Sequence, residues 1–165
     1  MGKVKILRLE IQEALKHAIQ VEMDLTRFYE AAVNRAATAR MRELLERILA
    51  EEQKHRLYYE KTYEELTGHR ILYLNVDPRR RLAEVVPVVE ETQDLLEQAL
   101  RNEEKAAAFY GEAARLVPPG WVRAKFEEMA EVEREHQALL RSGTAESVGT
   151  ERTSEEKPRA AAHAA

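Results

Sequence analysis

The sequence predicts an all-α fold, a four-helix bundle made of two repeated helical hairpins that are joined by a long crossover. Of the 165 residues, 44% are hydrophobic and 34% are charged, and only six Gly and five Pro are present to interrupt helices. Four long segments place apolar residues at three- and four-residue steps, the spacing of an amphipathic helix. The first two segments resemble the last two. A chain of this length is expected to form one domain around a single core.

The first hairpin is predicted at residues 7–37 and 40–67. Its first helix has no Gly or Pro, and its inward stripe is Leu15, Ala18, Glu22, Leu25, Tyr29, Ala32 and Ala36. A polar break around Thr38 separates it from the second helix, which ends before Gly68, a residue suited to a helix C-terminus. The stripe of this second helix is Met41, Leu45, Ile48, Glu52, His55, Tyr59 and Leu66. The short connection implies that the two helices are antiparallel.

The second hairpin is predicted at residues 83–116 and 119–142, with a break at Val117-Pro118-Pro119-Gly120. Residues 68–81 have no helical period and are expected to form an extended crossover. Fourteen extended residues reach at most about 46–50 Å, and a helix of 28 residues is about 42 Å long. The crossover can therefore span the bundle. Residues 143–165 are polar and small, and they predict a disordered tail in which His163 is no ligand candidate.

The two hairpins are one motif used twice. An offset of 81 residues superposes Glu22 on Glu103, Glu52 on Glu133 and His55 on His136 without a gap. The same offset superposes other identical residues, namely Leu15 on Leu96, Ala18 on Ala99, Phe28 on Phe109, Tyr29 on Tyr110, Ala32 on Ala113 and Arg42 on Arg123. The bundle is therefore expected to have two-fold pseudosymmetry.

The four repeated glutamates lie within apolar stripes, which predicts that four carboxylates meet in the bundle core. Unpaired carboxylates in such an interior cost several kcal/mol each and repel one another. The Glu-x-x-His spacing of Glu52 with His55, repeated in Glu133 with His136, places a carboxylate and an imidazole on one helical face. Two divalent cations would balance the charge of minus four. The six predicted metal ligands are Glu22, Glu52, His55, Glu103, Glu133 and His136.

Mixed oxygen and nitrogen ligands suit iron, manganese or zinc better than calcium or copper, and the sequence leaves iron, manganese or a mixed iron and manganese pair open. Tyr29 and Tyr110 lie two turns beyond Glu22 and Glu103 on the same face. Each phenol is expected either to hydrogen-bond a ligand carboxylate and assist catalysis or to fill the core. Other candidates are expected at the surface or in loops: Glu51, Glu104, Glu131, Glu135, His17 and His69. Trp121 is expected to cover the start of the last helix.

Composition excludes several other functions. The net charge of −4 comes from 30 acidic and 26 basic residues mixed along the chain, which argues against nucleic-acid binding. The absence of cysteine excludes disulfides, a thiol nucleophile, an iron–sulfur cluster and a rubredoxin module within these residues. No segment has the roughly 20 apolar residues of a membrane span, and residues 1–20 lack the apolar region of a signal peptide. A cytoplasmic location is therefore expected.

These motifs resemble the rubrerythrin branch of the ferritin-like di-iron carboxylate superfamily, without a rubredoxin domain. The resemblance covers roughly residues 8–142. It includes a Glu followed six residues later by Phe-Tyr, which occurs after Glu22 and again after Glu103. It implies that all six residues bind two iron ions, with Glu52 and Glu133 as bridging carboxylates and His55 and His136 as terminal ligands. Ala106 stands where rubrerythrins typically carry a further carboxylate.

The resemblance implies an oxidoreductase that reduces hydrogen peroxide or dioxygen at a carboxylate- and histidine-bridged dinuclear centre. Its electrons would come from an external donor such as a rubredoxin or a reductase. A homodimer is expected, and the reach of the crossover also permits helices to swap between subunits. Two alternatives remain at this point: a ferroxidase, iron-storage or metal-handling protein, and a structural bundle without catalytic activity.

Overall fold

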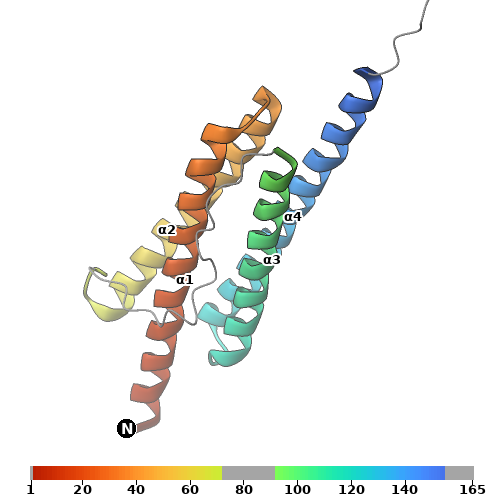
Figure 1. Cartoon of the computed structure of the whole chain (residues 1–165). Coiled ribbons are helices and arrows are strands. Elements are labelled where there is room, and N and C mark those ends of the chain that lie inside the picture. The colour runs from red at the N-terminus through yellow and green to blue at the C-terminus, as the bar shows by residue number, and fades with distance from the viewer. Residues whose placement is uncertain (1, 72–91, 155–165) are drawn as a thin grey trace, which may run out of the picture.

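Four helices form two hairpins that pack side by side (Figure 1). The computed structural model describes the backbone of residues 2–71 and 92–154 and the side chains of residues 10–71 and 95–143. The helices are α1 (Gly2–Arg35), α2 (Ala39–Thr67), α3 (Thr92–Leu116) and α4 (Trp121–Ser154). Helix α1 packs mainly on α2, and α3 packs mainly on α4. The predicted all-α bundle of two hairpins is thus confirmed.

Local signals in the sequence explain where the hairpins turn. The Thr38 hydroxyl accepts a hydrogen bond from the Met41 amide and caps the start of α2. Gly68 has φ 77°, a left-handed conformation that favours glycine, and its amide bonds the Glu64 carbonyl at the end of α2. In the α3–α4 turn, the Arg123 guanidinium donates to the Val117 carbonyl at 2.6 and 3.1 Å.

The ends of the elements differ in part from the sequence-based boundaries. Helix α4 continues to Ser154, although the disordered tail was expected from residue 143. Adding residues to an existing helix avoids the cost of nucleation, so a helix can extend into a polar segment without a core to bury it. The remainder of that tail, residues 155–165, lies outside the described residues. Most of the predicted crossover and residues 83–91 of the predicted third helix also lie outside them.

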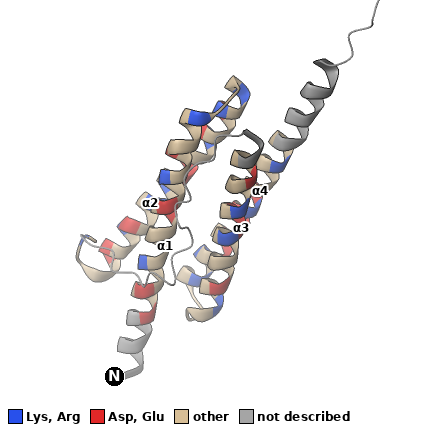
Figure 2. Ribbon diagram, in the orientation of Figure 1, with Lys and Arg blue, Asp and Glu red and all other residues tan. Residues whose placement is uncertain are grey.

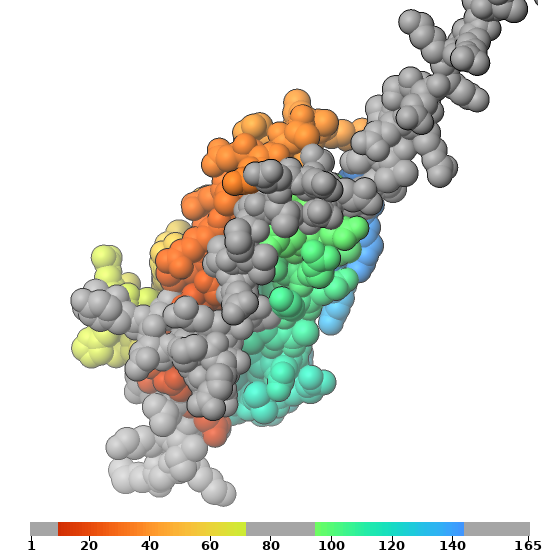
Figure 3. Space-filling model, in the orientation of Figure 1, coloured from red at the N-terminus to blue at the C-terminus, as the bar shows by residue number. Residues whose placement is uncertain are grey.

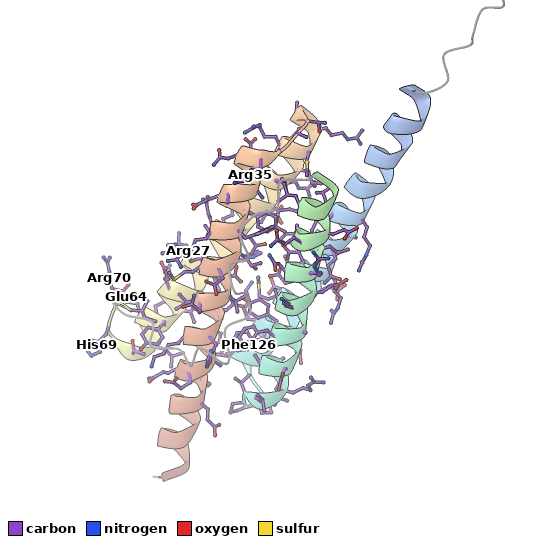
Figure 4. All side chains as sticks on the ribbon, viewed as in Figure 1. Arg27, Arg35, Glu64, His69, Arg70 and Phe126 are labelled. Carbon is purple, nitrogen blue, oxygen red and sulfur yellow. The ribbon has the colours of Figure 1, made fainter. Side chains whose placement is uncertain are left out.

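The buried residues of the bundle are mainly apolar, with a cluster of charged side chains and a few further polar ones, such as Gln20 and Asp24. Buried side chains from all four helices include Ile19, Leu45, Leu96 and Phe126, and Figure 4 shows Phe126 between the two hairpins. The space-filling view places the described parts of the two hairpins against each other (Figure 3). Acidic and basic residues are mixed along the described helices (Figure 2). No helix among the described residues is long and apolar enough to span a membrane.

Candidate metal centre

Four carboxylates meet in the middle of the bundle, one from each helix. Glu22 comes from α1, Glu52 from α2, Glu103 from α3 and Glu133 from α4, and all four have an exposed fraction of 0%. Each occupies an inward position of its helical stripe, so the amphipathic pattern that forms the core also delivers the carboxylates to its centre. Four acidic groups in a dry interior require positive charge for compensation.

Two imidazoles lie beside these carboxylates. The Nδ1 atom of His136 is 2.9 Å from Glu52, 3.2 Å from Glu133 and 3.6 Å from Glu103. The Nδ1 atom of His55 is 3.5 Å from Glu52 and 3.8 Å from Glu22. The two rings face each other with centroids 6.1 Å apart. Each histidine therefore directs one nitrogen toward its own group of carboxylates.

The six residues form two overlapping groups that have the geometry of metal sites. One group is Glu22, Glu52, His55 and Glu133, and in each group the donor atoms lie within 4.8 Å of one another. The other group is Glu52, Glu103, Glu133 and His136. Glu52 and Glu133 belong to both groups. The buried cluster is therefore consistent with a dinuclear metal site in which these two carboxylates lie between the ions.

The unsatisfied atoms of the cluster test whether metal ions fit. Among the described residues, eight buried atoms of these six side chains have no hydrogen-bond partner, including both oxygens of Glu52 and of Glu133 and the Nδ1 atoms of both histidines. Buried polar atoms without partners are uncommon in folded proteins. Carboxylate oxygens and imidazole nitrogens are donors that iron, manganese and zinc accept. The donor set therefore fits two such ions.

Two phenols donate hydrogen bonds to the two carboxylates that belong to one group each, Glu22 and Glu103, and each phenol comes from the opposite hairpin. The Tyr110 hydroxyl donates to Glu22 Oε1, and the Tyr29 hydroxyl donates to Glu103 Oε1. Each tyrosine thus contacts the carboxylate of the opposite hairpin, and both tyrosines are fully buried. The two expectations for these residues, core filling and hydrogen bonding, apply together. Tying α1 to α3 in both directions fixes the orientation of Glu22 and Glu103.

Glu51 lies off the stripe of α2 with its side chain 35% exposed, as expected from the sequence, but it also contacts the cluster, which the sequence did not indicate. Its Oε2 atom is 2.9 Å from His136 Nε2, and Arg47 lies 3.5 Å from its other oxygen. Glu51 points away from the stripe of α2 but toward α4, which approaches on that side. Position 132, which matches Glu51 in the repeat, is Val132. His136 therefore has a carboxylate on its outer nitrogen, and the repeat supplies no equivalent for His55.

The electrostatics of the cluster differ from residue to residue. Burial raises the pKa of Glu22 and Glu133 well above the usual range, and the charge of Glu52 adds to both shifts. Burial acts in the same direction on Glu52, but the imidazoles of His136 and His55 outweigh it and lower the pKa of Glu52 to about 2. Burial opposes protonation of His136, yet the carboxylates of Glu103, Glu133 and Glu52 raise its pKa. Protons thus compensate the charge when cations do not.

The remaining candidates lie away from the cluster. Glu104, Glu131 and Glu135 are exposed on α3 and α4, and His69 is exposed after α2, at the outer end of the first hairpin (Figure 4). His17 is half-buried on α1. Trp121 begins α4 and is 58% exposed. His163 lies outside the described residues.

The comparison with known protein families gives a match that covers the second hairpin. Residues 94–165 match the family model named Rubrerythrin. This part of the chain is rubrerythrin-like. It contains Glu103, Tyr110, Glu133 and His136, and the 81-residue repeat relates these residues to their counterparts in the first hairpin. The resemblance that the sequence motifs predicted is confirmed. No curated protein sequence matches the chain significantly.

Two solved structures share the fold over most of the chain. A hypothetical protein from Pyrococcus furiosus matches with a TM-score of 0.71 and 24% identity, covering 82% of this chain and 88% of that one. A bacterioferritin-related protein from Bacteroides fragilis, described as a dodecameric thioferritin, matches with a TM-score of 0.68 and 20% identity. It covers 94% of this chain and 99% of its own. The fold is ferritin-like.

Proposed function

We propose that this protein is a di-iron or di-manganese oxidoreductase that reduces hydrogen peroxide or dioxygen. The observation that carries the proposal is the pair of overlapping Glu/His groups that share Glu52 and Glu133 inside the core. Four carboxylates and two neutral imidazoles carry a charge of minus four, which two divalent cations neutralise. Two bound iron ions would supply electrons and adjacent open coordination positions for the oxidant. The Rubrerythrin match to residues 94–165 supports this choice.

The side chains of the bundle have three tasks in this function. Glu52 and Glu133 would hold both ions, Glu22 and His55 would hold one of them, and Glu103 and His136 would hold the other. Tyr110 and Tyr29 orient the outer carboxylates by hydrogen bonds. Buried neighbours such as Leu45 and Ile48 exclude bulk water, which strengthens every electrostatic interaction in the site.

Elemental analysis and rapid mixing test this proposal together. Protein purified without added metal should contain two iron or manganese ions per chain. Its ferrous form, mixed anaerobically with peroxide or with dioxygen, should change its absorption within one turnover. Repeated turnover with an added reductant is expected for an oxidoreductase. A protein with no stoichiometric metal, and with a melting temperature that chelators do not change, would contradict the proposal and favour a structural bundle.

A ferroxidase or iron-storage protein is the second candidate, because the fold also matches the dodecameric thioferritin. In that case ferrous iron is a substrate that is oxidised and kept. Many irons retained per chain inside a large hollow particle would favour storage. Turnover that needs continuous reductant, in a small assembly, would favour the oxidoreductase.

Assembly and partners are part of the same proposal. We expect a homodimer, with helix exchange between subunits as one way to form it, and analytical ultracentrifugation separates a dimer from a dodecamer. We also expect a cytoplasmic location and an external electron donor, such as a rubredoxin or a reductase. These residues contain no cysteine with which to build an iron–sulfur donor of their own.

Glu51→Ala should weaken metal binding roughly 10- to 100-fold, the usual effect of removing a hydrogen-bond partner of a ligating histidine. Without Glu51, the outer nitrogen of His136 loses the carboxylate that orients the ring and makes it a stronger ligand. Competition with a chromogenic chelator measures the affinity. Glu104→Ala is the matched control, because Glu104 is exposed and does not belong to the cluster. Its carboxylate pairs with Arg141, and the two charged groups are 3.2 Å apart. Equal affinity of the Glu51 variant and wild type would show that Glu51 does not hold His136.

A further inference from the structure

A row of aromatic side chains connects the candidate metal centre to the surface. The Tyr110 hydroxyl donates to Glu22, and the Tyr110 ring stacks on Tyr59 with centroids 5.8 Å apart and an interplanar angle of 13°. Tyr59 in turn meets the ring of Tyr58 edge-on at 5.4 Å. Tyr110 and Tyr59 are 0% and 1% exposed, whereas Tyr58 is 37% exposed. The row therefore begins at a carboxylate of the cluster and ends in solvent.

The outer end of the row lies beside an ion pair, Lys125 with Glu128 at 2.8 Å, and a second exposed aromatic side chain. The Lys125 ammonium lies over the Tyr58 ring, 4.7 Å from its centroid. Trp121, one helical turn before Lys125 on α4, is 58% exposed. Exposed aromatic rings beside a cation form a surface at which electrons can enter or leave the protein.

Within the described residues, the 81-residue repeat contains no second copy of this row. In the repeat, Tyr58 and Tyr59 correspond to Leu139 and Leu140. Phe126, which contacts both Tyr59 and Tyr110 at 5.9 Å, corresponds to Leu45. Tyr29 therefore keeps the phenol that bonds a carboxylate, and its ring meets Phe28 edge-on at 5.2 Å, but the repeat has leucines where Tyr58 and Tyr59 would continue the row. Packing alone does not require this difference, because Leu140 and Leu45 fill the equivalent core positions with 0% exposure.

We propose that Tyr58, Tyr59 and Tyr110 form a relay that carries single electrons from the surface to the Glu22 side of the metal centre. The inference rests on the proposed function, because reduction of one peroxide to two waters consumes two electrons and two protons. A one-electron carrier protein at the surface supplies each electron. While peroxide is reduced at the centre and acts as the oxidant, Tyr110 passes an electron inward and its phenolic proton to Glu22. An electron from Tyr59, which keeps its own proton, then restores Tyr110, and the proton of Tyr110 returns from Glu22.

The hydrogen bonds explain where an oxidised ring would come to rest. The proton of Tyr110 has an acceptor in Glu22, but the buried hydroxyl of Tyr59 has no hydrogen-bond partner among the described residues. Oxidation of a phenol is easier when its proton has an acceptor. Tyr59 is therefore oxidised only briefly, and Tyr110 is the ring that stays oxidised longest. Tyr58 takes an electron from the external donor and exchanges its proton with water, so no tyrosine is consumed.

Pulse radiolysis of the zinc-loaded protein tests the relay without peroxide chemistry, because zinc has no redox activity. Azide radicals produced by the pulse oxidise exposed aromatic side chains, and absorption follows the tyrosyl radical. In wild type, a long-lived fraction is expected as the radical moves to buried Tyr110. Tyr59→Phe keeps the ring and its packing but removes the oxidisable phenol, and it should lower that fraction severalfold. Tyr58→Phe, at an exposed position, should do the same without affecting folding.

Tyr63→Phe is the matched control, since Tyr63 lies on the same helix and packs against the core without belonging to the row. It should leave the long-lived fraction unchanged. A long-lived fraction that survives in both Tyr59→Phe and Tyr58→Phe would overturn the relay. Repeating the pulse on metal-free protein keeps the relay measurable if zinc does not bind.

A second measurement separates this inference from the proposed function. The ferrous-loaded protein is mixed with peroxide in the presence of ferrocyanide, a one-electron donor too polar to enter the core. Tyr59→Phe should slow ferrocyanide oxidation severalfold while peroxide loss in a single turnover is unchanged. If wild type consumes no peroxide, the proposed function fails and the pulse result alone decides the relay. If peroxide is consumed but ferrocyanide oxidation is equal in both proteins, the relay is wrong and the function stands.

Discussion

Glu52→Gln is expected to abolish binding of both metal ions. The Glu52 carboxylate is common to the two groups of ligands, and both of its oxygens are buried without hydrogen-bond partners among the described residues. An amide has the same shape but no charge, and its NH₂ end repels a cation. One substitution therefore weakens both positions. Metal content after dialysis, measured by elemental analysis, should fall from two ions per chain to none.

His55→Gln gives the contrasting result. His55 belongs to one group only, so the ions should fall from two to about one per chain, with the Glu103 and His136 end still filled. Glu46→Gln on the exposed side of the same helix makes the same chemical change as Glu52→Gln and should keep both ions. Equal loss in the Glu52 and His55 variants would show that Glu52 does not bridge two positions. Two ions retained in Glu52→Gln would show that neither ion needs the Glu52 carboxylate.

Most of this centre was predictable from the sequence, because charged residues interrupt the apolar stripes at repeated positions. Glu22, Glu52, Glu103 and Glu133 stand where apolar residues belong, and a helix period determines which face such residues occupy. Because all four helices turn that face inward, placing the carboxylates together required no knowledge of how the helices cross. The break near Thr38 and the helix end at Gly68 were predictable from local sequence, whereas the Thr38 cap was seen only in the structure.

Contacts between helices at the edge of the stripe could not be predicted in this way. Glu51 lies off the apolar stripe of α2, so the helical period predicts that its side chain faces solvent. Only the approach of α4 brings His136 within 2.9 Å of it. Tyr59 was visible as a core residue, but its stacking on Tyr110 depends on the height at which the two hairpins meet. Sequence periodicity gives the inward face of a helix and not its axial position relative to a neighbour. The relay and the support for His136 both depend on that axial position.

Removal of the metal ions should destabilise the protein, and more strongly as the pH rises. Glu22 and Glu133 have raised pKa values because of burial, and an ordinary glutamate, as in the unfolded chain, titrates near 4.5. A group with a raised pKa in the folded state contributes stability below its unfolded pKa and loses it as the pH rises through the folded value. His136, whose pKa is raised from 6.5, acts in the same direction. Glu52 acts oppositely, since its contribution is present above 4.5 and is lost as the pH falls toward about 2.

Thermal unfolding with a chelator, compared with zinc-loaded protein from about pH 5 to about pH 8, measures this effect. The metal-free protein should lose stability across this range, because Glu22 and Glu133 approach ionisation without a compensating cation. The loaded protein should not, because bound cations favour the ionised carboxylates. Each site held at 100 times its dissociation constant adds ~2.7 kcal/mol to the free energy of unfolding. The gap between the two melting curves should therefore widen as the pH rises.

Glu22→Gln identifies the source of this pH dependence. An amide cannot ionise, so the metal-free variant should have a flatter pH dependence of stability than the metal-free wild type, while zinc should stabilise the variant less. Glu104→Gln, at an exposed position on α3, should change neither quantity. A gap between loaded and metal-free protein that is the same at every pH would mean that Glu22 and Glu133 do not exchange protons for metal. Glu22 thus contributes to metal binding through the same buried charge that makes the metal-free bundle less stable, which is why one substitution should reduce both the pH dependence of the metal-free protein and the stabilisation by zinc.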